Sequence, residues 1–306
     1  MALLPIDLPL YRGFIMNTDR PSILNKIVSQ RQRRLQQNRL DISALKIEPS
    51  TRSLVAALES SSTGFIFECK QSSPSRGLLT KDYQPQLIAK QYQPFASAIS
   101  VLTEPDFFAG SLEHLSKVRA AVSQPILCKD FVIETEQLYA ARAAGADVIL
   151  LMLSVVSDQF WRQCFAITKA LGLDIITEVH NQHELDRAIA LPAKIIGINN
   201  RNLHSLTTDL SVTEALVANI PSDRLIITES GISTHQQLLR LAPLVDGFLI
   251  GSSLMQSKAI DRALRKLIYG EIKICGLTRR EDADLAWQLG ASFGGLIFTP
   301  RSSRCI

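Results

Sequence analysis

The chain has 306 residues, of which 46% are apolar and 20% are charged, and its net charge is +4 at pH 7. This ordinary globular composition excludes a disordered chain, a collagen-like chain and a small disulfide-stapled protein. At about 150 residues per domain the length suggests two domains, although one α/β barrel of about 250 residues also fits. The net charge is too small to predict binding to nucleic acid.

Neither the cysteines nor the apolar segments indicate secretion or a membrane. The five cysteines form no CxxC pair, which favours reduced thiols over a disulfide framework or a zinc site. The most apolar stretch, 148–156, is much shorter than the ~18 residues of a membrane span. The N-terminus lacks the basic segment of a signal peptide. We therefore expect a cytoplasmic monomer without a membrane partner.

The first predicted element is a helix. Apolar residues recur at helical spacing in the basic, polar segment 21–42, at Ile23, Leu24, Ile27, Val28 and Leu35. Residues 1–20 show no such pattern, and we expect them to form an irregular extension.

A repeating pattern begins at residue 64, where short runs rich in Val, Ile and Leu alternate with longer stretches of helical apolar spacing. The runs are 64–70, 97–103, 125–131, 147–153, 174–180, 194–200, 224–230 and 247–253. They are apolar throughout, as expected for parallel strands that are covered on both faces. Eight strand-then-helix units predict a closed (β/α)8 TIM barrel over 21–270, with the extra N-terminal helix packed across it. A doubly wound open sheet is the alternative, but it usually has fewer strands and a GxGxxG turn, which is absent here.

The pattern restarts after the eighth helix. Residues 272–276 and 293–298 are predicted strands, and 280–290 is a predicted helix between them. Two strands and one helix cannot close a core of their own. We therefore predict that 271–306 is the incomplete start of a second (β/α)8 barrel, which is mobile or rests loosely on the first.

In a (β/α)8 barrel, residues at the C-terminal ends of the strands point into one shared pocket. Residues i and i+2 of a strand share a face, so polar residues at this spacing project together. Three such pairs are Glu68 with Lys70, Glu178 with His180, and Asn199 with Arg201, and Lys129 ends the third run. A single polar strand end is usually a solvated loop, but burying the whole set is costly unless its members pair or bind a ligand. The set therefore predicts a functional site.

Two further strand ends carry glycine beside serine. Ser230-Gly231 follows the seventh strand, and Gly251-Ser252 follows the eighth. Backbone N–H groups of these two loops commonly bind phosphate in this fold, and glycine permits a close approach because it has no side chain. The two pairs together predict a phosphorylated small-molecule substrate.

Segments at these strand ends resemble indole-3-glycerol phosphate synthase. They are 68–77, 126–131, 177–179, 196–201, 229–232 and 248–252, and they occur in order at that family's strand positions. The likeness runs from about residue 21 to 270. The segment 273–304 resembles the start of phosphoribosylanthranilate isomerase, where Cys275 takes the place of that family's general base. The chain thus resembles a bifunctional bacterial synthase/isomerase protein that ends early in its isomerase domain.

The resemblance implies the decarboxylating, dehydrating ring closure of 1-(2-carboxyphenylamino)-1-deoxyribulose 5-phosphate to indole-3-glycerol phosphate, in tryptophan biosynthesis. It implies that Lys129 is the acid for ring closure, because the ketone oxygen must accept a proton as the aromatic carbon attacks. The later loss of hydroxide needs an acid and rearomatisation needs a base; Glu178, Glu68 and Lys70 are the candidates, in an open division of roles. This chemistry calls for no metal and no cofactor.

The remaining residues that the resemblance implies bind the substrate. Ser73, Asn199 and Arg201 hold the substrate and its carboxylate, Phe131 and Leu249 pack against its anthranilate ring, and Ser230, Gly231, Gly251 and Ser252 bind its phosphate. Isomerase activity is not expected, because only the first unit and the next strand of an isomerase barrel are present.

Two alternative functions stay open. A Schiff-base aldolase on the same fold would use Lys70 or Lys129 as its nucleophile, although the carboxylate partners argue against it. A non-catalytic phosphate-binding barrel would have lost its acid and base positions, but Glu68, Lys70, Lys129 and Glu178 are all present.

Overall fold

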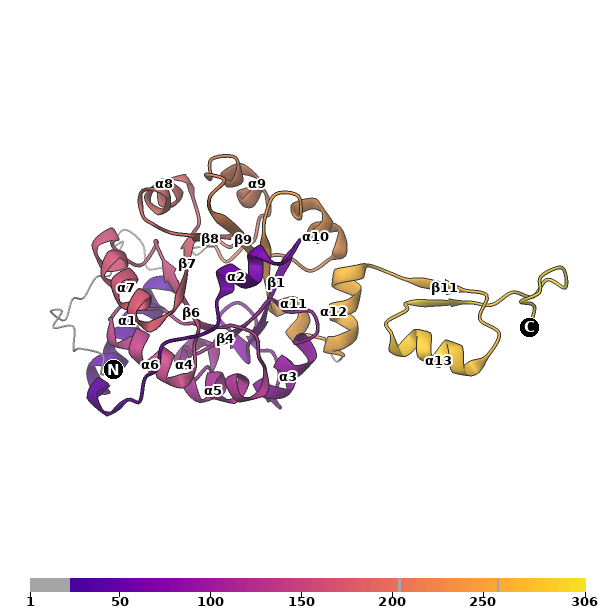
Figure 1. Ribbon diagram of the computed structural model, residues 1–306, viewed down its shortest axis with the longest axis horizontal. Coiled ribbons are helices and arrows are strands. Elements are labelled where there is room, and N and C mark those ends of the chain that lie inside the picture. Colours follow the sequence, from indigo (N-terminus) through magenta and orange to yellow (C-terminus); the bar gives the residue numbers. More distant parts are fainter. Residues whose placement is uncertain (1–22, 203–204, 258) are drawn as a thin grey trace.

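The computed structural model describes residues 23–202, 205–257 and 259–306, so the expectation for 1–20 lies outside the described residues. Eight parallel strands close into one barrel in the order β1-β10-β9-β8-β7-β6-β5-β4, which confirms the predicted (β/α)8 fold (Figure 1). The strands are β1 (Gly64–Cys69), β4 (Ala98–Leu102), β5 (Ile126–Lys129), β6 (Val148–Met152), β7 (Asp174–Val179), β8 (Ile195–Asn199), β9 (Leu225–Glu229) and β10 (Gly247–Ile250). Each strand lies within one predicted run.

Helices surround the barrel (Figure 1). The longer ones are α3 (Pro85–Tyr92), α5 (Leu112–Ala121), α6 (Glu136–Ala144), α7 (Asp158–Leu171), α8 (Gln182–Ala190), α9 (Ser211–Val217), α10 (His235–Leu241) and α12 (Ile260–Tyr269). Shorter ones are η1 (Ile42–Ala44), α2 (Leu54–Glu59), α4 (Pro105–Phe108) and α11 (Ser252–Met255). Because α11 begins at Ser252, the predicted strand 247–253 ends at Ile250.

The N-terminal end of the barrel is closed by α2. Leu54 and Leu58 of this helix are fully buried, and a Cβ on Gly64 would lie 2.2 Å from Cδ2 of Leu58. Asp174 at the start of β7 accepts a hydrogen bond from the backbone N–H of Leu54 at 2.6 Å. This end is therefore a packed core, and a ligand site needs the opposite end.

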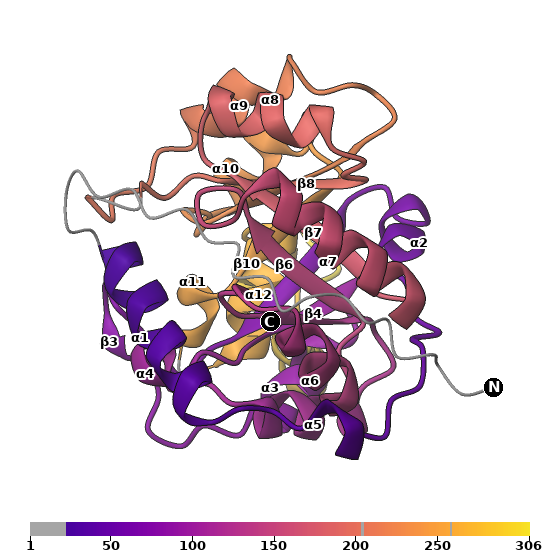
Figure 2. The same cartoon turned by 90° about the vertical axis from the view of Figure 1, so that its left-hand side faces the viewer.

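The predicted N-terminal helix is α1 (Ile23–Gln37), which buries four residues of the predicted apolar stripe: Leu24, Ile27, Val28 and Leu35. It lies beside α4 (Figure 2). Arg31 reaches from α1 to the end of β5, where its Nη2 donates to Oδ2 of Asp130 at 2.8 Å. A buried ion pair thus ties the helix to the mouth of the barrel.

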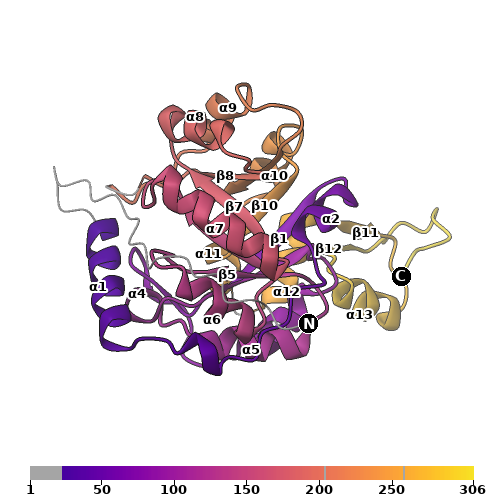
Figure 3. The same cartoon turned by 60° about the vertical axis from the view of Figure 1, so that its left-hand side comes forward.

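After α12 the chain forms a small unit of β11 (Lys273–Cys275), α13 (Arg280–Gln288) and β12 (Phe293–Gly295). The two strands pair in parallel, and the unit projects from the barrel (Figures 1 and 3). The predicted strand 293–298 is shorter in the structure, since β12 ends at Gly295. This strand-helix-strand order agrees with the expected pattern, and its assignment to a second barrel stays a prediction.

Candidate active site

A cavity of about 340 Å³ opens at the C-terminal ends of the barrel strands. Every barrel residue to which the resemblance assigned a role lines it: Glu68, Lys70, Ser73, Lys129, Phe131, Glu178, Asn199, Arg201, Ser230, Gly231, Leu249, Gly251 and Ser252. His180, which was expected to project together with Glu178, does not line the cavity. Cys275 lies on β11, outside this cavity, and is exposed. Residues of all eight barrel strands line the cavity, because parallel strands all end on one side.

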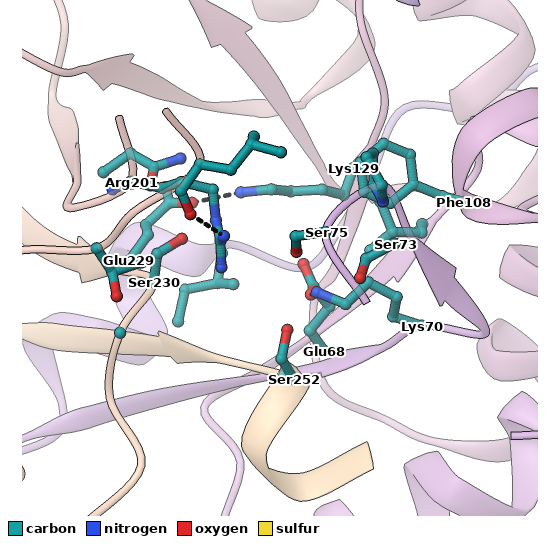
Figure 4. A pocket seen from close by; sticks show the side chains of 18 of the residues that line it. Glu68, Lys70, Ser73, Ser75, Phe108, Lys129, Arg201, Glu229, Ser230 and Ser252 are labelled. Carbon is teal, nitrogen blue, oxygen red and sulfur yellow. Dashed lines mark hydrogen bonds and ion pairs between the residues drawn. The ribbon is translucent and has the colours of Figure 1, made fainter. Parts of the chain in front are cut away.

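Lys129 is the last residue of β5 and extends into the pocket toward Glu229 (Figure 4). Its Nζ contacts Oε2 of Glu229 on β9 and lies 3.5 Å from Oε2 of Glu178 on β7. Burial alone would lower the pKa of Lys129, but the surrounding carboxylates, Glu229 foremost, hold this pKa above its ordinary value. The ammonium therefore stays charged inside the pocket.

Glu178 is the penultimate residue of β7, and polar groups surround its carboxylate. Its Oε1 accepts a hydrogen bond from Nδ2 of Asn199 at 3.1 Å and lies 3.2 Å from Nε2 of His180. Burial alone would raise the pKa of Glu178, but Lys129, His180 and Asn199 lower it to about 2. Glu178 is therefore a carboxylate at neutral pH, and its Oε2 faces Lys129.

Glu229 is a buried site residue for which the sequence predicted no role. Its Oε1 accepts no hydrogen bond from the described residues, and a Cβ on Gly197 would lie 2.6 Å from this oxygen. Burial raises the pKa of Glu229, Lys129 opposes this, and the charge of Glu178 adds to it, so that the pKa is about 7. Its position at the end of β9, directly before Ser230, is the sequence feature that could have identified Glu229 as a pocket residue.

Glu68 and Lys70 form the second ion pair of the pocket. Nζ of Lys70 donates to Oε1 of Glu68 at 2.5 Å, and both side chains are nearly buried. A Cβ on Gly251 would lie 2.5 Å from that same carboxylate oxygen. Glycine at 251 therefore makes room for Glu68, a steric reason in addition to the close backbone approach that the sequence suggested.

The loops after β9 and β10 form another wall of the pocket. Ser230 (φ 66°) and Gly231 (φ 86°) both adopt left-handed backbone conformations, which are strained for a residue with a side chain. Oγ of Ser253 donates to the carbonyl oxygen of Ile232 at 3.0 Å and so ties this turn to α11. A turn fixed in this way can present backbone N–H groups to an anionic ligand.

A sequence model of the family "Indole-3-glycerol phosphate synthase" matches residues 24–267. The chain belongs to the indole-3-glycerol phosphate synthase family. Relatives named "Tryptophan biosynthesis protein TrpCF" are similar along most of the chain. The Vibrio cholerae serotype O1 relative is 47% identical over 288 residues, which are 93% of this chain and 61% of the relative. The Vibrio parahaemolyticus serotype O3:K6 relative is 50% identical over 261 residues, which are 84% of this chain and 54% of the relative.

A third relative of the same name, from Helicobacter pylori strain ATCC 700392 / 26695, is 45% identical over 294 residues, which are 94% of this chain and 64% of the relative. The chain therefore spans roughly three fifths of the length of the curated relatives that it matches. The family match covers the barrel and α1, whereas the similarity to relatives also extends beyond residue 270.

In this synthase-family barrel, the rim of the pocket contains side chains for which the sequence analysis predicted no role. Arg76, in the turn between β2 (Ser72–Ser73) and β3 (Gly77–Leu78), contacts Oε1 of Gln256 after α11. The ring of Phe108 on α4 lies 6.1 Å from that of Phe131, centroid to centroid. These contacts join loops that are far apart in sequence, so no local pattern reveals them.

Arg201 follows β8 and is half-buried in the wall of the pocket. Its Nη1 donates to the carbonyl oxygen of Leu206 at 2.9 Å, and its backbone N–H donates to Oδ1 of Asn199 at 3.0 Å. Burial lowers the pKa of Arg201, and the charge of Arg76 adds to this effect. The guanidinium is thus anchored at one nitrogen and remains a cation, since arginine keeps its proton in proteins.

Across the described ranges, no group of three or more His, Cys, Asp and Glu side chains is placed to hold a metal ion. His180 instead contacts the carboxylates of Glu178 and Glu184. A bilayer-spanning helix, long and apolar enough to cross, is also absent from the described part of the chain.

Proposed function

We propose that this chain catalyses the ring closure of 1-(2-carboxyphenylamino)-1-deoxyribulose 5-phosphate to indole-3-glycerol phosphate, carbon dioxide and water, as a step of tryptophan biosynthesis. One observation carries the proposal: in a barrel of this family, a charged Lys129 lies between Glu178 and Glu229 in one pocket with the glycine-containing loops. The names of the relatives support the pathway. We place the reaction in the barrel of residues 21–270, in a cytoplasmic monomer.

Ring closure begins when an aromatic carbon of the substrate attacks the ketone carbon. The ketone oxygen then takes a proton from Nζ of Lys129, which Glu178 and Glu229 hold in the charged form and direct into the pocket. The carboxylate leaves as carbon dioxide, and its electron pair stays in the ring. A positioned general acid contributes about 10²–10⁴-fold to such a step.

The hydroxyl group left by the ketone then departs as water, and one further proton must leave before the indole ring is aromatic. Glu178 suits the base, because it is ionised at neutral pH and presents Oε2 to the pocket. Lys70 suits the acid that protonates the departing hydroxyl, with Glu68 holding its ammonium in place. This division assigns the three candidates that the sequence left open.

Substrate binding follows from the walls of the pocket. Arg201 offers a planar guanidinium to the substrate carboxylate, together with Asn199 and Ser73. The loops with Gly231 and Gly251 meet the phosphate. The anthranilate ring packs on the apolar side of the pocket, against Phe131, Leu249, Leu24 and Ile27.

A Schiff-base aldolase is the weaker candidate. Its nucleophile must be a neutral amine, which requires a lysine with a lowered pKa. Lys129 has a raised pKa, and Lys70 is paired with Glu68 at 2.5 Å. Both lysines are therefore better suited to donate a proton or to bind an anion than to attack a carbonyl carbon.

The test is to incubate the purified chain with the carboxyphenylamino-deoxyribulose phosphate and to follow indole fluorescence. We expect turnover in the wild type, a loss of at least ~100-fold in Lys129→Met, and no loss in Lys117→Met, an exposed lysine on α5. Tight binding of substrate without product would favour the non-catalytic barrel. A substrate adduct trapped by borohydride on Lys70 or Lys129 would favour the aldolase.

A further inference from the structure

His180 lies directly after β7, and its nearly buried side chain has no role in the mechanism described above. Its Nε2 lies 3.2 Å from Oε1 of Glu178, and its Nδ1 lies 3.1 Å from Oε2 of Glu184 on α8. The imidazole ring therefore spans two carboxylates. One of them lines the pocket, and the other belongs to the surrounding helix layer.

Glu184 is a rigid support for this ring. Its Oε2 also accepts the backbone N–H of His180 at 2.8 Å, and its Oε1 accepts Nδ2 of Asn181 at 3.0 Å. Its own backbone N–H donates to Oδ1 of Asn181, the N-cap of α8, at 3.0 Å. The Glu184 side chain cannot rotate away without losing its hydrogen bonds from the backbone N–H of His180 and from Nδ2 of Asn181, and this holds its carboxylate beside Nδ1 of His180.

The two oxygens of Glu178 are consequently unequal. Oε1 accepts a hydrogen bond from Asn199 and forms an ion pair with His180, whereas Oε2 lies 3.5 Å from Nζ of Lys129. We propose that His180 is a positioning residue for Glu178, which holds Oε1 in place and thereby presents Oε2 to Lys129 and the substrate. This rests on the proposed function, in which Glu178 exchanges a proton with the reacting molecule.

The charges around the ring support this role. Burial alone would lower the pKa of His180, but Glu178 and Glu184 raise it to about 10, so the ring is an imidazolium at neutral pH. Three other charged or polar groups belong to the elements around His180. They are Lys129 of β5, the neutral Asn199 of β8, and Arg187 of α8, which forms an ion pair with Asp158 at 2.7 Å. His180 therefore supplies the positive charge on the Oε1 side of Glu178.

The test compares wild type with His180→Gln, which keeps a hydrogen-bond donor but removes the charge. A cation beside a carboxylate lowers its pKa by about 1–3 pH units, so the acidic limb of the kcat profile should move upward by about that amount. KM should stay within about twofold, because His180 does not line the pocket. His183→Gln, at an exposed histidine in the first turn of α8, is the matched control and should follow the wild type.

A second readout does not depend on turnover. The carboxyl ¹³C resonance of Glu178 reports its titration, and His180→Gln should raise the midpoint while His183→Gln leaves it unchanged. If the wild type makes no indole product, the proposed function fails, and this titration still decides the role of His180. Equal midpoints in wild type and His180→Gln, or a variant with raised KM and an unshifted kcat profile, would overturn the positioning role.

Glu184→Gln keeps the proposal testable if His180→Gln does not fold. It leaves the imidazole in place but removes the charge that anchors Nδ1, so kcat should fall at constant KM. The ¹⁵N titration midpoint of His180 should also fall below about 10. An unchanged kcat together with an unchanged His180 midpoint in this variant counts against the proposal.

Discussion

At the scale of single residues, the pocket is governed by the cost of burying charge. Lys129, Glu178 and Glu229 are each almost completely removed from water, and each is stable there only because an opposite charge lies within a few ångströms. The same demand explains the glycines: Gly197 and Gly251 stand where a side chain would collide with a buried carboxylate. The carboxylates beside these two positions therefore require a glycine there.

Gly251→Ala tests this coupling. The added Cβ would lie 2.5 Å from Oε1 and 2.8 Å from Cβ of Glu68, which must shift and loosen its contact with Lys70. We expect kcat/KM to fall at least ~10-fold, with part of the loss in kcat because the Glu68–Lys70 pair moves. Steady-state kinetics measure this, and Gly294→Ala in the C-terminal unit is the control. Wild-type kinetics in Gly251→Ala would show that Glu68 adapts freely.

His180 also predicts how stability depends on pH. Its pKa is about 10 in the folded protein and about 6.5 when unfolded, so the folded state binds the proton more tightly. The stabilisation is complete below about pH 6.5 and is lost as the pH rises toward about 10. The free energy of unfolding, measured by urea titration, should thus exceed that of His180→Gln by at least about 1 kcal/mol at pH 6, with a smaller difference at pH 10. A difference that grows with pH would contradict the assignment.

At the scale of secondary-structure elements, α1 connects the N-terminal segment to the mouth of the barrel. Its apolar stripe packs on the barrel, and Ile23, Leu24 and Ile27 reach the lining of the pocket. The ion pair between Arg31 and Asp130 connects the helix to the residue that follows Lys129. The position of α1 and the geometry of the acid are therefore linked through two adjacent residues of the chain.

Arg31→Ala should loosen α1 and leave Asp130 buried without its cation. Burial already raises the pKa of Asp130, although Arg31 opposes this effect. In the variant the carboxyl group should therefore take up a proton, which reduces the loss of stability. We expect the free energy of unfolding to fall by about 1–3 kcal/mol and KM to rise. Arg33→Ala, an exposed neighbour on the same helix, should change neither. Unaltered melting and kinetics in Arg31→Ala would mean that apolar packing alone holds the helix.

At the scale of the whole molecule, the barrel and the C-terminal unit differ in how they are built. The barrel has one continuous buried core, whereas β11, α13 and β12 leave large apolar side chains exposed, among them Trp287, Phe293 and Phe298. The unit meets α12 through Arg262, whose guanidinium lies 3.0 Å from the centre of the Trp287 ring, and through Arg265, which donates to the carbonyl oxygen of Leu289. Neither contact approaches the pocket.

We therefore expect removal of residues 271–306 to leave ring closure intact. The kcat/KM of a chain ending at 270 should stay within about twofold of the full chain, since distant sites without shared partners act independently. Solubility should improve, because an exposed apolar surface promotes association. Indole fluorescence and light scattering measure the two effects. A shortened chain that folds but has lost turnover would show that the unit supports the barrel.

The eight strands, their parallel pairing and the residues at their C-terminal ends can all be predicted from the sequence. These are local or periodic properties: a continuously apolar run predicts a strand covered on both faces, and a fixed barrel topology then places Glu68, Lys129 and Glu178 in one mouth. The helical stripe of α1 was readable for the same reason.

Which of these groups contact one another depends on how the chain folds in three dimensions. Lys129 and Glu229 are 100 residues apart and belong to strands that are not neighbours in the barrel, so their contact depends on closure of the sheet. The same holds for Gly251 beneath Glu68, for Arg31 on Asp130, and for His180 between Glu178 and Glu184. Charge states in the pocket follow from these distances and from burial, which no spacing along the chain encodes.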